Sequence, residues 1–557
     1  QQPVTLGAAL IGPTVKGPVE DPILVTTFSD YTSRFGTSLQ SGSGTYTPLT
    51  TLAAQNYFAN GGTSLTVARA VPSASLWTFA TASILASSGS DGQIHSFTIE
   101  SLDKGIEFNN SGSLVANDAL ATGSIDNIRY EIATNNTSSG LFSLVIRRGD
   151  DTDVNKVVLE TFPNLSLDET QPNYISAVIG DQTRNYNATE NYIEISGSHP
   201  NNSRYIRVKE VLKPTYNFFD NAGNARSIYT ASIPAVGSGS EGGAFSGATG
   251  SNFTTLAKGN NYYSDINSTN SQGLVGKDYN NMISLLSNQD DYRYNLMLLP
   301  GLTDQSHSSP ITKAISNAQS RGDHMVIVDP VNYASTQVQA KTEAAGRDTS
   351  YASMYWPWLR TIDPDSGENV WVPASTMMGG VFAFNDNASE PWFAPAGINR
   401  GGLGTVIQAE RKLSATNRDD LYQANINPIA TFPGTGVVVY GQKTLQKQAS
   451  ALDRVNVRRL LIELKGYISQ IGQNLVFEQN TAATRNNFLA QVNPYLESVQ
   501  SRQGLYAFKV IMDESNNTPD VIDRNQLIGQ IYIQPTRTAE FIYLDFNLQP
   551  TGASFPA

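Results

Sequence analysis

Apolar and polar positions first follow the pattern of a compact α/β unit. Buried-strand runs occur at VTLGAALIGP (4–13), PILVTTF (22–28) and SLTVARAV (64–71), with the helix-like segment PLTTLAAQNYFANGG (48–62) between the last two. Short apolar runs bounded by glycine and proline are typical of buried strands. The glycines at 61 and 62 predict the end of the helix, because glycine enters the left-handed conformation without a Cβ clash.

Between residues 73 and 265 the pattern changes to short alternating segments. Examples are HSFTIES (95–101), LFSLVIRR (141–148) and NYIEISG (191–197), and polar tracts such as GSGSEGGAFSGATGSN (237–252) separate the segments. Alternation with a period of two predicts strands, and Gly/Ser/Asn tracts predict long surface loops. We interpret this region as a β-rich insertion.

The α/β pattern returns after residue 266. YNLMLLPG (294–301) and HMVIVDP (324–330) predict buried strands, and SSPITKAISNAQSRG (308–322) predicts a helix between them. Two buried strands joined by one helix predict a parallel crossover unit. The fold class expected from these patterns is α/β and multidomain, with N-terminal and C-terminal parts that together form one core around the insertion.

One helix near the C-terminus has an unusual charge pattern. In SALDRVNVRRLLIELK (450–465), Ser450 and Asp453 match the S-x-x-[DE] cap of a helix start. Helical spacing places the apolar residues in one stripe, formed by Val457, Leu461, Leu464, Ile468, Ile471 and Leu475. The same spacing places the basic residues on one edge of that stripe, namely Arg454, Arg458 and Lys465.

This basic edge has two interpretations. It is either a docking surface for an acidic partner or a solvated edge with local ion pairs, such as Arg459 with Glu463.

The last predicted strand, AEFIYLDFNLQ (539–549), has one wholly apolar face and one mixed face. The apolar face holds Ile542, Leu544, Phe546 and Leu548, and the mixed face holds Phe541, Tyr543, Asp545 and Asn547. A strand this long at a chain end is an aggregation hazard when its edge stays free. We expect it to pair with a sheet that includes strands of a neighbouring copy, and the alternative is that it completes a sheet of its own chain.

Composition narrows the class of protein. The chain has 557 residues, a formal net charge of −12 and no cysteine, which removes disulfides, thiolate metal sites and cysteine nucleophiles. The acidic balance argues against a nucleic-acid binder, whose affinity depends on neutralising phosphates. No apolar run is long enough to span a membrane, and the start lacks the features of a signal peptide.

Candidate chemistry is weak throughout. GVVVYGQKT (436–444) misses the phosphate-binding loop pattern, because Gln442 displaces Lys443 and the valines favour a strand. The four histidines lack the spacing of zinc ligands. We therefore expect no enzyme activity, no catalytic residues, no cofactor and no metal.

Several segments together resemble the tail sheath proteins of contractile-tailed bacteriophages. The resemblance rests on DRVNVRRLLIELK (453–465) and NNTPDVIDRNQLIGQIYIQPTRTAEFIYLDFNLQPTGASF (516–555). It also includes LIGPTVKGPVEDPILVTTFSDYTSRFG (10–36), FANGGTSLTVARAV (58–71) and PWFAPAGINRG (391–401).

The resemblance implies a structural subunit that polymerises as stacked rings around an inner tube. The sheath is built in a long metastable state, and contraction drives the tube through the host envelope. The implied partners are further copies of the chain, the inner tail tube protein, and the baseplate and tail terminator proteins, without direct contact to nucleic acid or membrane. The implied location is the virion, and the host cytoplasm during assembly.

On this reading the basic residues Arg454, Arg458 and Lys465 face the tube. The expected divisions are an N-terminal arm and first strand (1–20), the first part of the core (21–72), β-rich outer domains (73–265), an α/β core domain (266–430), a C-terminal inner domain (431–539) and a C-terminal arm (540–557).

Two alternatives remain. One is the sheath of a bacterial contractile injection system or a tail-like bacteriocin. The other is an enzyme or adhesin displayed on a virion or secretion device, with the β-rich region as its active or binding part.

Overall fold

The computed structural model describes residues 7–41, 44–87, 94–251 and 262–540. At its centre is an eight-stranded sheet with the strand order β2-β5-β1-β14-β15-β16-β20-β21. Its strands are β1 (Ala8–Gly12), β2 (Ile23–Val25), β5 (Leu65–Arg69), β14 (Leu296–Thr303), β15 (Met325–Asp329), β16 (Ala352–Trp356), β20 (Ile426–Phe432) and β21 (Gly436–Val439). The six inner strands are parallel, and the two edge strands, β2 and β21, run antiparallel to their neighbours.

Strands from both sides of the β-rich region in the sequence build this sheet. β1 pairs in parallel with β5 on one side and with β14 on the other, so Leu10 faces Val67 and Leu298. The parallel pairing of β14 with β15, joined by α6 (Asp304–Arg321), confirms the predicted crossover unit. The prediction of a mixed α/β fold is likewise confirmed.

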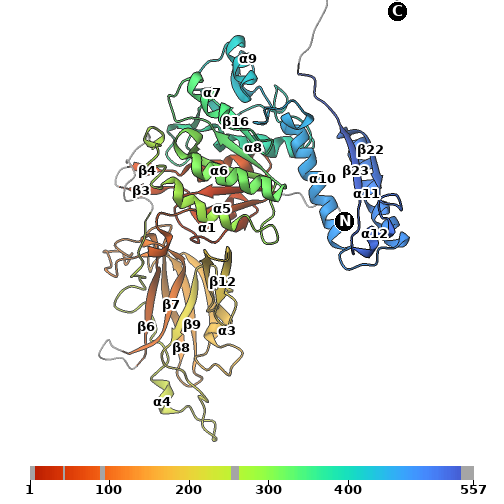
Figure 1. The fold of residues 1–557 in the computed structure, drawn as a ribbon. Coiled ribbons are helices and arrows are strands. Elements are labelled where there is room, and N and C mark those ends of the chain that lie inside the picture. The colour runs from red at the N-terminus through yellow and green to blue at the C-terminus, as the bar shows by residue number, and fades with distance from the viewer. Residues whose placement is uncertain (1–6, 42–43, 88–93, 252–261, 541–557) are drawn as a thin grey trace, which may run out of the picture.

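Helices cover both faces of the sheet (Figure 1). On one face α2 (Leu49–Ala59) and α8 (Ala374–Ala388) pack over Leu10, Leu298 and Ile327. On the other face α5 (Asn280–Leu285) and α6 pack over Ile11, Met297 and Val326. Neighbouring residues of one strand thus enter opposite cores, as the period of two in a strand requires.

Smaller elements complete the core. The helices are α1 (Phe28–Phe35), α7 (Gln337–Ala345) and α9 (Ala415–Gln423). A three-stranded sheet contains β17 (Leu359–Ile362), β18 (Asn369–Val372) and β19 (Val406–Ala409), and a hairpin contains β3 (Leu39–Ser41) and β4 (Gly44–Tyr46).

A separate β domain lies at one end of the core (Figure 1). Its two three-stranded sheets and one hairpin contain β6 (Phe79–Leu85), β7 (His95–Lys104), β8 (Ile128–Asn136), β9 (Leu141–Arg148), β10 (Val158–Leu165), β11 (Thr183–Asn187), β12 (Tyr192–Ser196) and β13 (Ile206–Val211). It also carries the short helices α3 (Ile175–Ile179) and α4 (Ser227–Thr230).

This β domain has a hydrophobic core of its own. Phe97, Ile132, Phe142 and Leu144 all lie in one buried cluster that excludes the residues of the central sheet. The chain enters and leaves the domain side by side, because the Thr78 N–H donates to the Thr249 carbonyl at 3.1 Å. An insertion whose ends meet in this way does not force apart the sheet into which it is inserted.

The C-terminal part lies beside the core, away from the β domain (Figure 1). It contains α10 (Val455–Gln473), α11 (Ala482–Ser501), α12 (Pro519–Asp523) and a two-stranded sheet of β22 (Leu505–Ile511) and β23 (Gln530–Pro535). Figure 1 shows α10 between the central core and the layer of α11, β22 and β23. Within the described ranges, no helix combines the length and apolar character needed to cross a membrane.

Candidate assembly surfaces

Helix α10 begins later than the sequence predicts. The Ser450 hydroxyl accepts a hydrogen bond from the Leu452 N–H, so it caps the 3₁₀ turn Ala451–Asp453 and not α10. Arg454 follows in an extended conformation, and the α-helix starts at Val455 without a side-chain cap. The prediction that Ser450 caps the long helix is therefore wrong, because a short 3₁₀ turn separates Ser450 from α10.

Two separate cores bury α10. Val455 and Ile462 belong to the hydrophobic core of the central sheet, whereas Leu460 and Leu464 belong to the core of the C-terminal part. Every residue from Val455 to Leu460 is buried. The predicted stripe is only half right: Val457, Leu464 and Ile471 are buried, whereas Leu461, Ile468 and Leu475 are partly exposed.

Burial on two sides changes the role of the central arginines. Arg458 is only 6% exposed, its guanidinium lies 4.0 Å from the ring centre of Tyr351, and it donates a hydrogen bond to the Ser350 hydroxyl. Burial lowers the pKa of Arg458. Arg459 forms an ion pair with Asp386, with N–O distances of 2.5 and 2.6 Å. Both arginines join parts of the same chain.

The ion pair of Arg459 with Asp386 takes the place of the expected local pair with Glu463. Lys465, in contrast, is exposed. Its Nζ lies beside Gly322, where α6 ends, and so complements the partial negative charge of that helix end. The expected single ridge of Arg454, Arg458 and Lys465 is thus interrupted, and Arg458 is not available at the surface of this chain.

Arg454 binds the last described residue of the chain. Its Nε and Nη2 atoms donate to the two carboxylate oxygens of Glu540, at 2.7 and 2.9 Å, and its Nη1 lies 3.0 Å from Asp453. The side chains of Arg454 and Glu540 are 25% and 17% exposed. Two parallel charge-assisted hydrogen bonds between planar groups fix direction as well as distance.

Further contacts reinforce this pair. The Gln442 amide donates to the Thr538 hydroxyl at 2.6 Å and to Glu540 at 3.2 Å. Burial raises the pKa of Tyr422, and the negative charge of Glu540 raises it further. Burial alone would lower the pKa of Arg454, but its hydrogen bonds to Glu540 raise it. Residues 538–540 are therefore held at a defined point before the terminal segment.

The sheet of β22 and β23 is the second candidate surface. The strands pair antiparallel, with Phe508 opposite Ile533, and these side chains pack against the C-terminal core. On the other face Tyr506 and Tyr532 are exposed. Within the part of the chain that the structure describes, no third strand pairs with either one, so both outer edges keep unpaired backbone groups.

Apart from its first residue, Glu540, the predicted terminal arm (540–557) falls outside the described residues. This applies to all five of its predicted contact residues, which are Phe541, Ile542, Leu544, Phe546 and Leu548. Its pairing with a neighbouring copy stays a prediction.

Sequence reasoning missed the anchor of this arm. Arg454 and Glu540 are 86 residues apart, and Gln442 and Glu540 are 98 residues apart. Two features of the sequence could have pointed to it. Glu540 is a single acidic residue directly before the predicted apolar strand, and Gln442 is the residue that breaks the phosphate-loop pattern. Among residues 7–41, 44–87, 94–251 and 262–540, no group of three or more His, Asp or Glu residues could hold a metal ion.

Comparison with known proteins identifies two matching families of domains. Residues 272–445 match the phage tail sheath protein central domain, and residues 447–549 match the phage tail sheath C-terminal domain. The boundary between the two matches lies after β21 and before α10.

Curated relatives agree with these matches. The chain is 40% identical over 228 residues to a tail sheath protein of Vibrio phage KVP40, covering 41% of this chain and 33% of that protein. It is 35% identical over 246 residues to a tail sheath protein of Enterobacteria phage T4, covering 44% and 36%. The aligned regions thus span about a third of the length of these relatives.

A solved structure resembles the whole fold. The crystal structure of a sheath tail protein from Listeria innocua matches with a TM-score of 0.53, at 10% identity, and covers 96% of each chain. At this identity the likeness concerns the fold alone.

Proposed function

We propose that this chain, which belongs to the phage tail sheath family, is a subunit of a contractile tail sheath. In this proposal copies of the chain polymerise as stacked rings around an inner tube, and contraction of the polymer drives the tube through the host envelope. The role is mechanical, and no catalytic step is assigned to any residue.

The proposal rests mainly on one observation, the contacts that fix Glu540 directly before the C-terminal arm. Arg454 and Gln442 hold Glu540 in place, so the residues that follow it leave from a fixed point. The edges of the β22–β23 sheet supply unpaired backbone groups for an incoming strand. An arm from one copy that pairs with this sheet in a neighbour would link the copies by backbone hydrogen bonds.

Such a link suits a polymer that changes shape. A strand that pairs at the end of a hinge stays bonded while the bodies on either side rotate, whereas a rigid interface of packed side chains would have to break. The long polymer is then metastable, because an activation barrier separates it from a more stable, shorter array. A signal at one end of the polymer lowers this barrier.

The proposed tube contact is electrostatic and involves the exposed charge on α10 and the partly exposed charge that directly precedes it. Lys465 is exposed and Arg454 is partly exposed, whereas Arg458 is buried. Exposed ion pairs contribute only about 0–1 kcal/mol each, so several of them can hold an acidic tube and still release it. The same proposal includes contacts of the polymer with the baseplate and tail terminator proteins. It also places the chain in the virion and, during assembly, in the host cytoplasm.

The other settings considered from the sequence are less well supported. Identities of 40% and 35% to phage proteins favour a phage tail over an injection system or a tail-like bacteriocin. The displayed adhesin or enzyme is not supported, because the matched domains are those of sheath proteins.

Electron microscopy of the purified chain tests the proposal. We expect tubular polymers in negative stain, and their loss on deletion of residues 541–557, which leaves the Arg454–Glu540 pair in place. Phe546→Asp should weaken polymerisation, whereas Asn547→Asp on the mixed face of the predicted strand serves as the matched control. Monomers or small closed oligomers of the intact chain, under all assembly conditions, would contradict a sheath.

A further inference from the structure

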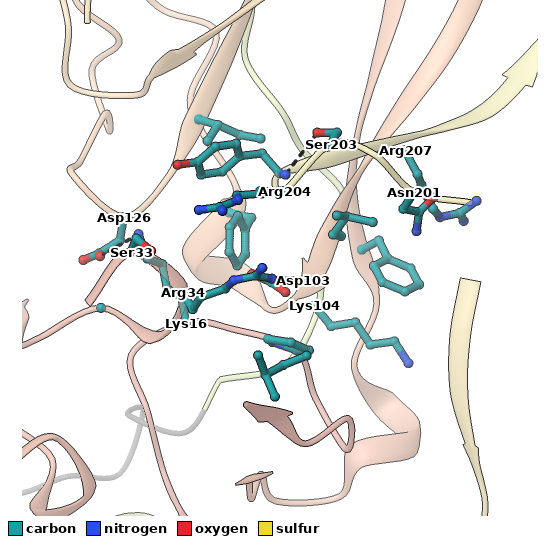
Figure 2. A pocket seen from close by; sticks show the side chains of 18 of the residues that line it. Lys16, Ser33, Arg34, Asp103, Lys104, Asp126, Asn201, Ser203, Arg204 and Arg207 are labelled. Carbon is teal, nitrogen blue, oxygen red and sulfur yellow. Dashed lines mark hydrogen bonds and ion pairs between the residues drawn. The ribbon is translucent and has the colours of Figure 1, made fainter. Parts of the chain in front are cut away.

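A cavity of about 780 Å³ lies where the β domain meets the central core. The core contributes the loop after β1 and helix α1, with Lys16 and Arg34, and the β domain contributes Asp103, Arg204 and Arg207 (Figure 2). Its volume is within the range of small-molecule sites, which are about 300–1,000 Å³.

Positive charge dominates the lining, although the chain as a whole is acidic. The basic side chains are Lys16, Arg34, Lys104, Arg148, Arg184, Arg204 and Arg207, and the acidic ones are Asp21, Asp103 and Asp126.

Four of the basic residues are neutralised within the chain. Lys16 pairs with Asp126 at 3.3 Å, and Arg184 pairs with Asp21 at 2.5 Å. Similarly, the guanidinium of Arg148 pairs with Asp150, and that of Arg207 pairs with Glu100.

Three cations lack an ion-pair partner among the described residues, namely Arg34, Lys104 and Arg204. The Nε atom of Arg34 is buried and has no hydrogen-bond partner there, and the same holds for the Nε atom of Arg207. A buried donor without a partner costs about 1–3 kcal/mol, so such donors are normally satisfied. In Figure 2 the side chain of Arg34 extends into the cavity, with Arg204 across from it.

One acid of the lining, Asp103, remains to offset these three cations. Asp103 is partly buried, and burial raises its pKa to about 6 against the opposing effect of Arg69, Lys16 and Arg34, so it is mostly ionised at neutral pH and offsets one of the cations. Apolar rings complete the lining: Phe79 and Phe108 border the cavity, and Lys104 lies over the Phe79 ring at 5.1 Å.

We propose that this cavity binds a small organic anion that bears phosphate, sulfate or carboxylate groups. The anionic groups pair with Arg34 and Arg204, and the apolar part of the ligand packs on the phenylalanine rings. Because Arg34 belongs to the core and Arg204 to the β domain, the bound anion bridges the two and fixes the angle between them. This site goes beyond the proposed sheath function and requires no polymer.

Binding of pyrophosphate and AMP to the purified full-length subunit tests the proposal. At low ionic strength we expect saturable binding of both by calorimetry, with one site per chain and a rise in melting temperature. Adenosine, which lacks the charge, should not bind. Arg34→Gln and Arg204→Gln should each weaken binding at least about tenfold, a free-energy difference of about 1.4 kcal/mol. The exposed Arg204 provides a variant that does not disturb the fold.

Lys412→Gln is the matched control, since Lys412 is an exposed cation outside the cavity. It should bind both anions within twofold of the unmodified chain. Equal weakening by Lys412→Gln and Arg204→Gln, or no saturable binding, would overturn the proposal. Absent binding combined with a polymerisation defect in Arg204→Gln would also overturn it, and would assign the cavity to an acidic side chain of a second copy.

Discussion

Glu540, the last described residue, receives two hydrogen bonds from the guanidinium of Arg454, at 2.7 and 2.9 Å. Arg454 directly precedes α10, and β23 ends five residues before Glu540, at Pro535. The pair therefore joins the start of the helix to the segment from which the C-terminal arm departs.

Breaking this pair should release the arm. We expect Arg454→Gln and Glu540→Gln each to speed tryptic cleavage after the exposed Arg537 and to raise the subunit concentration needed for polymerisation. The double variant should be little worse than either single one, with a coupling free energy of roughly 1–3 kcal/mol. Arg502→Gln, which breaks a surface pair with Glu390, is the control and should change neither readout.

Substitutions of Arg458 and Lys465 should affect different properties: subunit stability for Arg458 and tube binding for Lys465. Arg458→Ala removes a buried guanidinium from Tyr351 and Ser350, and should destabilise the subunit by roughly 2–4 kcal/mol. Lys465→Glu should leave the melting temperature within a degree or two, but weaken co-assembly with the tube at low salt, where exposed pairs are strongest. Unchanged tube binding by Lys465→Glu would remove this residue from the tube contact.

Replacement of residues 73–265 by a short linker should leave a folded remainder that still polymerises. The β domain has its own core, and the chain enters and leaves it side by side at Thr78 and Thr249. Arg69 would lose its hydrogen bond to the Lys104 carbonyl but keep those to Val15 and Gly17, so we expect only a modest loss of stability. Circular dichroism tests whether the remainder is folded, and electron microscopy tests whether it polymerises. An unfolded product would show that the β domain shares the central core.

Asp329 should make stability depend on pH. It is fully buried, accepts hydrogen bonds from the N–H and hydroxyl of Ser375, and burial raises its pKa to about 7. The unfolded chain releases this proton near pH 4, so between about pH 4 and 7 the folded state binds more protons and loses stability as pH rises.

Asp329→Asn removes this ionisation with little change of shape. At pH 8 it should raise the free energy of unfolding relative to the unmodified chain by an amount on the order of a few kcal/mol, seen as a higher melting temperature, and the rise should be much smaller at pH 5. Equal destabilisation at both pH values would show that the carboxyl group is needed for its hydrogen bonds and not penalised for its charge.

The sequence predicted the parallel core well, because local patterns specify it. Leu296–Leu299 and Met325–Val328 are buried runs separated by one helix, and a crossover places such strands side by side. The switch to alternating segments likewise predicted the β-rich region, since the side chains of a strand with one buried face alternate.

The sequence predicted α10 and its charges less well, because helical periodicity assumes one buried face. Here Val455 and Leu460 enter different cores, so both faces are buried and Arg458 lies between them. The anchor at Glu540 was invisible for another reason: an ion pair between residues 86 apart leaves no local pattern, and only the folded chain brings the two together.

The position of β1 between β5 and β14 also determines the order in which the sheet can form during synthesis. When Arg69 has left the ribosome, β1 can pair only with β5, and its other edge waits for β14, which begins at Leu296. At about 5–20 residues per second, this wait lasts roughly 10–45 s. The β domain is synthesised in that interval and can fold on its own core, while the backbone groups on the free edge of β1 stay open to pairing with other nascent chains. The time needed to synthesise the insertion, more than its final shape, therefore sets how long this edge of β1 stays unpaired.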